Sequence, residues 1–179
     1  MKNTQTNFIA PLHLACGKDD LRPTMQCIYF DADGYAWSTD AHILIKHKVL
    51  DSDIIDKENL IDKMIHKDIF TKIIKYNKIQ ATKEGILCFD KDNNSVLFPY
   101  DNRGLTPFRY YTAVPNNELQ PITYLSLNNK ILKRLSDILK PFPLWQFQFR
   151  GTDKPVIIKI KEFDTIILVM PSYIKDSDF

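Results

Sequence analysis

The segment Ser38-Thr39-Asp40-Ala41-His42-Ile43-Leu44 is a polar turn set between runs of β-forming residues. Two runs precede it, residues 26–31 and 35–38, and the residues that separate them, Asp31-Ala32-Asp33-Gly34, are typical of a hairpin turn. A third run, residues 42–49, begins within the segment 38–44 and continues beyond it. The pattern predicts three consecutive short strands near the start of the chain.

A second group of strands is expected near the end of the chain. Two apolar stretches stand out there, Lys154-Pro155-Val156-Ile157-Ile158 and Ile167-Leu168-Val169-Met170-Pro171. Short apolar runs bounded by turn residues are typical of strands. We therefore predict strands over residues 144–150, 156–162 and 165–170.

Helices are expected at three places, residues 8–18, 65–77 and 129–139, and Asn128 is a suitable N-cap for the third. Further strands are predicted over residues 80–82, 85–90, 95–100 and 122–127. A helix followed by several short strands thus occurs three times. Several short strands per helix favour antiparallel pairing over parallel crossovers. The predicted class is α+β, with helices packed on one face of antiparallel sheets.

The composition limits the classes of protein that the chain can belong to. With 179 residues, 44% of them hydrophobic, the chain can bury a substantial core. The net charge of +2 gives no overall sign of nucleic-acid binding, so such a role must rest on local clusters. Three cysteines without metal or redox spacing indicate reduced thiols and a cytoplasmic location. No apolar run is long enough to span a membrane.

The second and third predicted helices each carry cations opposite their apolar side. At helical spacing the apolar residues gather within about a third of the circumference. The cations on the other side are Lys67, Lys72, Lys75, Lys130, Lys133 and Arg134. Such faces are often simply solvated, but they also suit contacts with DNA phosphates, which need cations and no base-reading groups.

In their order along the chain, the two groups of strands resemble the bacterial DNA polymerase sliding clamp family. In that family a strand pair ends in a Thr-Asp-Gly-His-Arg-Leu loop and the last strand ends in a Met-Pro pair. This chain has Ala41 at the glycine and Ile43 at the arginine, and it matches the pair with Met170 and Pro171. The resemblance implies a DNA-clamp-like fold built from helix-plus-strands modules. It divides the chain into a clamp-like domain of two modules, residues 1–115, and a third half-module, residues 116–179.

The resemblance also implies a pocket that binds short peptides of polymerases, clamp loaders and repair proteins. Adaptable methionines and apolar walls suit such a pocket. The residues that match its wall are Met25, Thr39, His42, Leu44, Val156, Leu168, Met170 and Pro171. Residues 110–115 resemble the family's stretch between modules, which borders the pocket.

The function implied by the resemblance is a non-enzymatic clamp that tethers replication or repair partners at double-stranded DNA, without reading its sequence and without a cofactor. A ring of twelve modules would need four copies of a three-module chain, so a homo-oligomeric ring is one expectation. The alternative is a clamp-derived module, of a phage or mobile element, that binds peptides and does not encircle DNA.

A nuclease built on Asp40 and His42 is a third hypothesis, since acid–histidine pairs occur in such sites. A simpler interpretation is that Asp40 caps a tight turn. The four histidines have no metal-ligand spacing, and the chain has no phosphate-binding loop. Two Asp-rich turns, residues 31–34 and 90–94, resemble the start of calcium loops. The first lacks the later ligands, and the second has Ser95 where the loop needs glycine, although Asp101 stands at the twelfth position. We therefore expect no metal and no catalytic residues.

Overall fold

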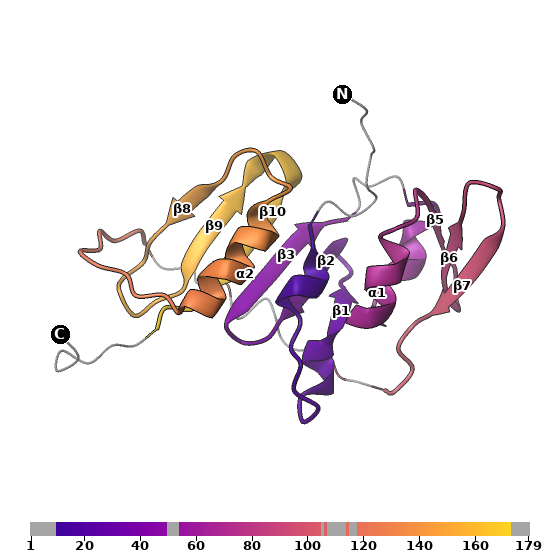
Figure 1. The fold of residues 1–179 in the computed structure, drawn as a ribbon, viewed down its shortest axis with the longest axis horizontal. Coiled ribbons are helices and arrows are strands. Elements are labelled where there is room, and N and C mark those ends of the chain that lie inside the picture. Colours follow the sequence, from indigo (N-terminus) through magenta and orange to yellow (C-terminus); the bar gives the residue numbers. More distant parts are fainter. Residues whose placement is uncertain (1–9, 50–53, 105, 107–113, 115–117, 173–179) are drawn as a thin grey trace.

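A computed structural model describes residues 10–49, 54–104, 106, 114 and 118–172 of the chain. Within these residues the strands form two antiparallel sheets (Figure 1). The larger sheet has seven strands in the order β4-β1-β2-β3-β10-β9-β8, and the smaller has the order β5-β6-β7. The α+β class and the antiparallel sheets predicted from the sequence are confirmed.

The bounds of the elements are as follows. The strands are β1 (Cys27–Phe30), β2 (Tyr35–Thr39), β3 (Ile43–Lys48), β4 (Lys63–His66), β5 (Lys78–Ala81), β6 (Gly85–Phe89), β7 (Ser95–Pro99), β8 (Gln146–Gln148), β9 (Val156–Ile160) and β10 (Thr165–Val169). The α-helices are α1 (Lys67–Ile73) and α2 (Asn129–Leu139). Short 3-10 helices are η1 (Leu12–Ala15), η2 (Pro23–Gln26), η3 (Lys57–Leu60) and η5 (Lys161–Phe163).

The pairing of β3 with β10 joins the two groups of strands. It is antiparallel over five residue pairs, among them Leu44 with Leu168 and Ile45 with Ile167. Branched side chains of this kind stabilise a sheet when they face each other across strands. The start and the end of the chain therefore share one continuous sheet.

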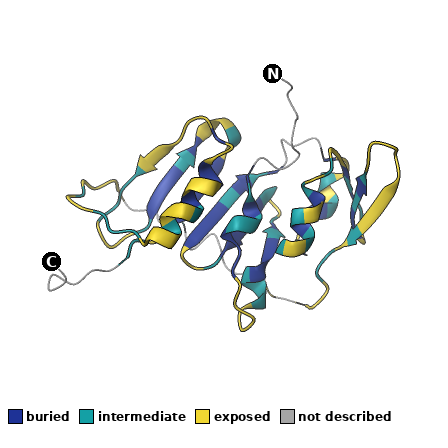
Figure 2. Ribbon diagram, in the orientation of Figure 1, coloured by how far each residue is buried: buried dark blue, intermediate teal, exposed yellow. Residues whose placement is uncertain are grey.

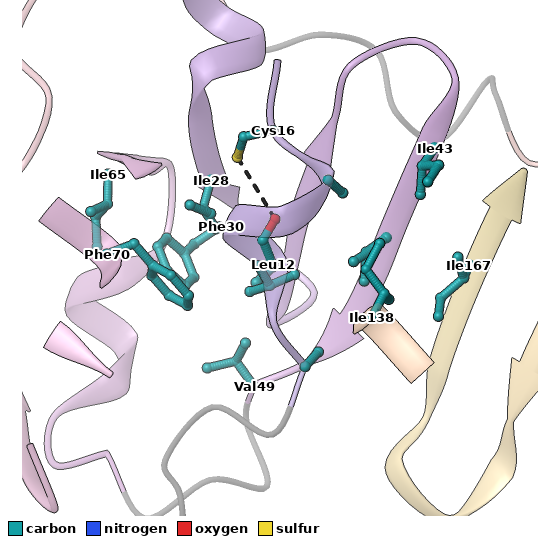
Figure 3. Packing of buried hydrophobic residues seen from close by; sticks show 14 of the residues in the cluster. Leu12, Cys16, Ile28, Phe30, Ile43, Val49, Ile65, Phe70, Ile138 and Ile167 are labelled. Atoms are coloured by element: carbon teal, nitrogen blue, oxygen red, sulfur yellow. Dashed lines mark hydrogen bonds between the residues drawn. The ribbon is translucent and has the colours of Figure 1, made fainter. Parts of the chain in front are cut away.

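The helices α1 and α2 and the short helix η1 lie on one face of the large sheet (Figure 1). The inward residues of the central strands are buried, whereas β7, β8 and the outer sides of the helices are exposed (Figure 2). Leu12 of η1 fills the space between Phe70 of α1 and Ile138 of α2 (Figure 3). One hydrophobic core thus holds all three helices against the sheet.

Helix α2 has the predicted bounds because its sequence carries both a cap and an apolar side. The side chain of Asn128 accepts a hydrogen bond from the amide of Lys130 at 2.8 Å and so satisfies one of the free donors at the helix start. Leu135, Ile138 and Leu139 are buried against the sheet.

Several predicted elements were wrong in extent or type. The predicted helix 65–77 begins too early, because residues 63–66 form β4 and pair with β1. A short apolar run fits either element, and the neighbouring strand decides. Of the predicted helix 8–18, the described part holds only the 3-10 turn η1, and residues 8 and 9 lie outside it. Residues 122–127 form no strand, and β8 is shorter than the predicted strand 144–150.

No helix in the described ranges is long and apolar enough to cross a membrane.

Buried His47 makes the stability of the fold depend on pH. It is 4% exposed on β3, and its Nδ1 lies 2.7 Å from the hydroxyl of Thr165. Burial lowers the pKa of His47 from 6.5 to about 4. Below pH 6.5 the unfolded chain therefore takes up a proton that the folded chain does not, and stability falls as the pH drops.

We predict that His47 alone removes about 3 kcal/mol from the free energy of unfolding between pH 7 and pH 4. Urea unfolding across this range measures it. The conservative variant His47→Gln should lose stability with a shallower pH slope than the natural chain. An unchanged slope would show that His47 is not held neutral.

Candidate nucleic-acid interface and peptide site

Four lysines project from the helices that cover one face of the sheet. Lys130 and Lys133 are exposed on α2. Lys72, near the end of α1, and Lys75, just after it, are also exposed. Helices α1 and α2 pack on the same face of the sheet (Figure 1). Because their apolar residues are buried against that face, the exposed lysines are placed on the outer side of the two helices.

The other two predicted DNA-contacting cations are engaged within the protein. Lys67 donates a short hydrogen bond from Nζ to the carbonyl of Gly17. Arg134 forms an ion pair with Asp40, with 2.6 Å between Nη2 and Oδ2. Two exposed acids, Asp68 and Asp137, reduce the positive charge of the helix face. The face is therefore basic through four exposed lysines rather than six cations.

The loop from Thr39 to Ile43 is held by its own side chains. The Thr39 hydroxyl donates to the carbonyl of Ile43 at 2.8 Å and accepts from the amide of Ala41 at 3.0 Å. Asp40 Oδ1 accepts from the amides of His42 and Ile43, each at 2.9 Å. Ala41 has a φ of 75°, the left-handed conformation that glycine adopts most readily. Ala41 therefore adopts a backbone conformation that suits glycine, the residue that the sliding clamp family has at this position.

Asp40 connects this loop to the helix face. Its carboxylate caps the loop with one oxygen and pairs with Arg134 of α2 with the other. Its side chain is 13% exposed, so the pair is partly shielded from water. The arrangement gives Asp40 a structural role, and no cluster of three metal-binding side chains occurs in the described part of the chain.

The predicted pocket residues separate into four places. Leu44 and Leu168 face each other on the side of the sheet away from the helices, where they form a small cluster with Trp37 and Ile157. They are 5% and 4% exposed, so little of their surface is open to a ligand. Most of residues 110–115 lie outside the described residues, but Val114 packs against this cluster.

Val156 lies on the opposite side, in the core beneath the helices. Thr39 is buried in the loop. Met25 is half-buried next to Gly17: a β-carbon built at Gly17 would lie 3.4 Å from Met25 Cβ and 3.8 Å from Asp40 Cα. Met25 therefore borders the loop rather than the sheet cluster.

The remaining three residues form an accessible group where β3 begins and β10 ends. The amide of Met170 donates to the carbonyl of His42 at 2.9 Å, and Met170 is 38% exposed. His42 and Pro171 line a cavity of about 380 Å³. Its other lining residues are Asp40, Asn128, Lys130, Ile131, Arg134 and Ser172.

This cavity lies where the loop, the end of β10 and the start of α2 meet. Its α2 side was not expected from the sequence, because nothing local in the chain shows that Arg134 reaches Asp40. The cavity mixes apolar surface with both signs of charge, which suits an extended polypeptide better than a small apolar molecule.

The three cysteines offer no nucleophile. Cys16, Cys27 and Cys88 are buried and free. Burial raises the pKa of the Cys16 thiol, and it raises those of Cys27 and Cys88 to about 12. The reactive thiolate is therefore disfavoured at neutral pH.

Comparison with solved structures shows the fold of bacterial DNA polymerase sliding clamps. The chain superposes on the clamp from Bacillus subtilis with a TM-score of 0.71 and 13% identity, over 96% of this chain and 62% of that one. For the clamp from Pseudomonas aeruginosa the TM-score is 0.70 and the identity 12%, over 95% of this chain and 64% of that one. For the clamp from Bartonella birtlesii bound to griselimycin the TM-score is 0.68 and the identity 12%, over 94% of this chain and 64% of that one.

The chain thus spans just under two thirds of the length of these clamps. No protein-family model matches the sequence, and no curated protein matches it significantly. At identities of 12–13% the likeness concerns the fold.

We predict that Asp40→Ala lowers the free energy of unfolding by about 2–3 kcal/mol, because two loop amides and Arg134 lose their charged acceptor. Asp40→Asn keeps an oxygen for the amides and should cost less. Thermal and urea unfolding of both variants measure the effect. Equal stability of Asp40→Ala and the natural chain would contradict the structural role of Asp40.

Proposed function

We propose that the protein is a non-enzymatic, clamp-like tether that holds partner proteins at double-stranded DNA. The likeness to sliding clamps supports the fold, and the lysines on the helix side support the contact with DNA. The observation that carries the proposal is the position of four exposed lysines on the side of the sheet that α1 and α2 cover. They are Lys72, Lys75, Lys130 and Lys133.

The contacts would be independent of DNA sequence. Lysine side chains supply point charges to phosphates, and such contacts carry no information on the base sequence. Exposed acids such as Asp137 keep the net attraction modest. Weak, salt-sensitive binding fits a protein that holds DNA without fixing its position.

We place the partner site where β3 begins and β10 ends, around His42, Met170 and Pro171. The exposed methionine can adapt to different apolar side chains. The neighbouring cavity, with Lys130 and Asp40 on its wall, can take the backbone and charged groups of a short peptide. The buried pair Leu44 and Leu168 would stabilise the strands that carry this site and would not contact the peptide.

We predict that the double variant Lys130→Glu/Lys133→Glu weakens binding to short duplex DNA at low salt by at least about tenfold. The slope of log affinity against log salt should become shallower by about 2, one for each lost phosphate contact. Fluorescence anisotropy with several unrelated duplexes measures both quantities.

The matched control is Lys46→Glu/Lys159→Glu, which makes the same charge change on the opposite side of the sheet. This control should bind DNA nearly as well as the natural chain after correction for net charge. Equal losses in both variants would show that overall charge, and not the helix side, governs binding.

We predict that Met170→Asp weakens peptide binding by at least about tenfold in affinity, because a carboxylate replaces the exposed apolar contact. Griselimycin, which the Bartonella clamp binds in its solved structure, serves as the probe in isothermal titration. The control is Leu97→Asp on the exposed strand β7.

If Leu97→Asp weakened the binding of griselimycin as much as Met170→Asp, the proposed site would be wrong. Retained griselimycin binding in a protein that has no affinity for DNA would instead favour the second candidate, a peptide-binding module that does not encircle DNA.

A further inference from the structure

The large sheet has an approximate two-fold arrangement about the junction of β3 and β10. Moving outward from this pair, β2 corresponds to β9 and β1 corresponds to β8. Each set of three strands follows helical structure, η1 and then η2 in one case and α2 in the other. The sheet continues beyond β1 to β4, but among the described residues it ends at β8. The position outside β8 is therefore the counterpart of β4.

Strand β4 shows what occupies such a position. It runs antiparallel to β1, and its inward residue Ile65 is buried. Its last residue, His66, is followed directly by the first residue of α1, Lys67. A strand immediately ahead of a helix thus covers the edge of the neighbouring set of strands.

Among the described residues no strand pairs with the outer edge of β8, and the surface beside this edge is apolar. Trp145 and Phe147 are 40% and 45% exposed, and Leu132 of α2 is also exposed beside them. These three side chains line a cavity of about 780 Å³ between α2 and β8. The side-chain oxygen of Gln148, Oε1, is buried without a hydrogen-bond partner among the described residues. A contiguous apolar patch beside an open strand edge is typical of an interaction surface.

The segment at residues 122–127 is the counterpart of β4 in the sequence. It lies directly ahead of α2, separated from it only by the cap Asn128, and it is rich in strand-forming residues. Tyr124 is 66% exposed. The backbone is held at Gln120, which donates to Phe149, and at Ser126, which accepts from Ser172. Between these two points, residues 121–125 make no backbone hydrogen bond within the described part of the chain.

We infer that two copies of the chain associate through these two features. The segment 122–127 of each copy forms a strand antiparallel to β8 of the other, as β4 does with β1. The apolar groups of α2 and β8 become buried in the same contact. Each copy supplies one strand and one edge, so the interface is two-fold symmetric and closes on itself.

The charges around the cavity agree with a second copy as the occupant. Asp137 and Lys140 both line it, so each copy presents one charge of each sign. A two-fold axis can place Asp137 of one copy near Lys140 of the other. A surface that is self-complementary in shape and in charge fits an identical partner better than an unrelated one.

Crosslinking tests this pairing directly and needs no DNA, so its outcome is independent of the proposed tethering role. Tyr124→Cys and Phe147→Cys are purified separately as full chains and then mixed with a short bismaleimide. The natural cysteines are buried and should not react. The mixture should give a crosslinked dimer in a yield about tenfold above that of either variant alone. The matched control mixes Phe147→Cys with Val96→Cys, which lies on the exposed strand β7 at the other end of the protein.

Light scattering across a wide range of concentration gives the second readout. The natural chain should approach twice its mass of 20.9 kDa. Trp145→Lys/Phe147→Lys should raise the dimer dissociation constant by at least about tenfold, while Val96→Lys leaves it unchanged. Circular dichroism verifies that each variant remains folded, as expected for exposed positions.

A natural chain that stays at 20.9 kDa at every concentration would overturn the inference. Crosslinking of Val96→Cys as efficient as that of Tyr124→Cys would overturn it as well, because it would place the contact elsewhere.

Discussion

The antiparallel pairing of β3 with β10 is the contact on which the rest of this protein depends. It joins five residue pairs from opposite ends of the sequence, and it turns two sets of three strands into one sheet. Because both sets present isoleucine and valine to the same side, a single core forms beneath α1, η1 and α2. Helices that share a core must also share an outer side, and this places their lysines together.

The same pairing creates the proposed partner site. It brings the loop around Asp40 next to Met170 and Pro171, and it brings α2 close enough for Arg134 to reach Asp40. One carboxylate thus contacts both the loop of the peptide site and the helix that carries Lys130 and Lys133. A partner that displaced Arg134 from Asp40 would release a cation at the edge of the basic side, so the two sites are physically connected.

Local sequence signals were sufficient for some elements and insufficient for others. Asn128 and the spacing of Leu135, Ile138 and Leu139 define α2 without any distant contact. By contrast, Ile65 belongs to a strand only because β1 lies beside it. Residues 122–127 have strand-forming character, but within the described ranges they pair with no strand. The burial of Leu44 and Leu168 depends on packing on the far side of the sheet, and the engagement of Arg134 depends on a residue remote in sequence. Helix periodicity alone therefore predicted six DNA-contacting cations, whereas four of them are exposed.

Whether the helix face binds DNA can be tested by a lysine footprint of the protein with and without duplex DNA, in which acetylation is read at each residue by mass spectrometry. We expect that DNA protects Lys72, Lys75, Lys130 and Lys133, and that Lys46 and Lys159 on the other side of the sheet react as before. Protection spread evenly over both sides, or confined to the side away from the helices, would contradict a DNA-binding helix face.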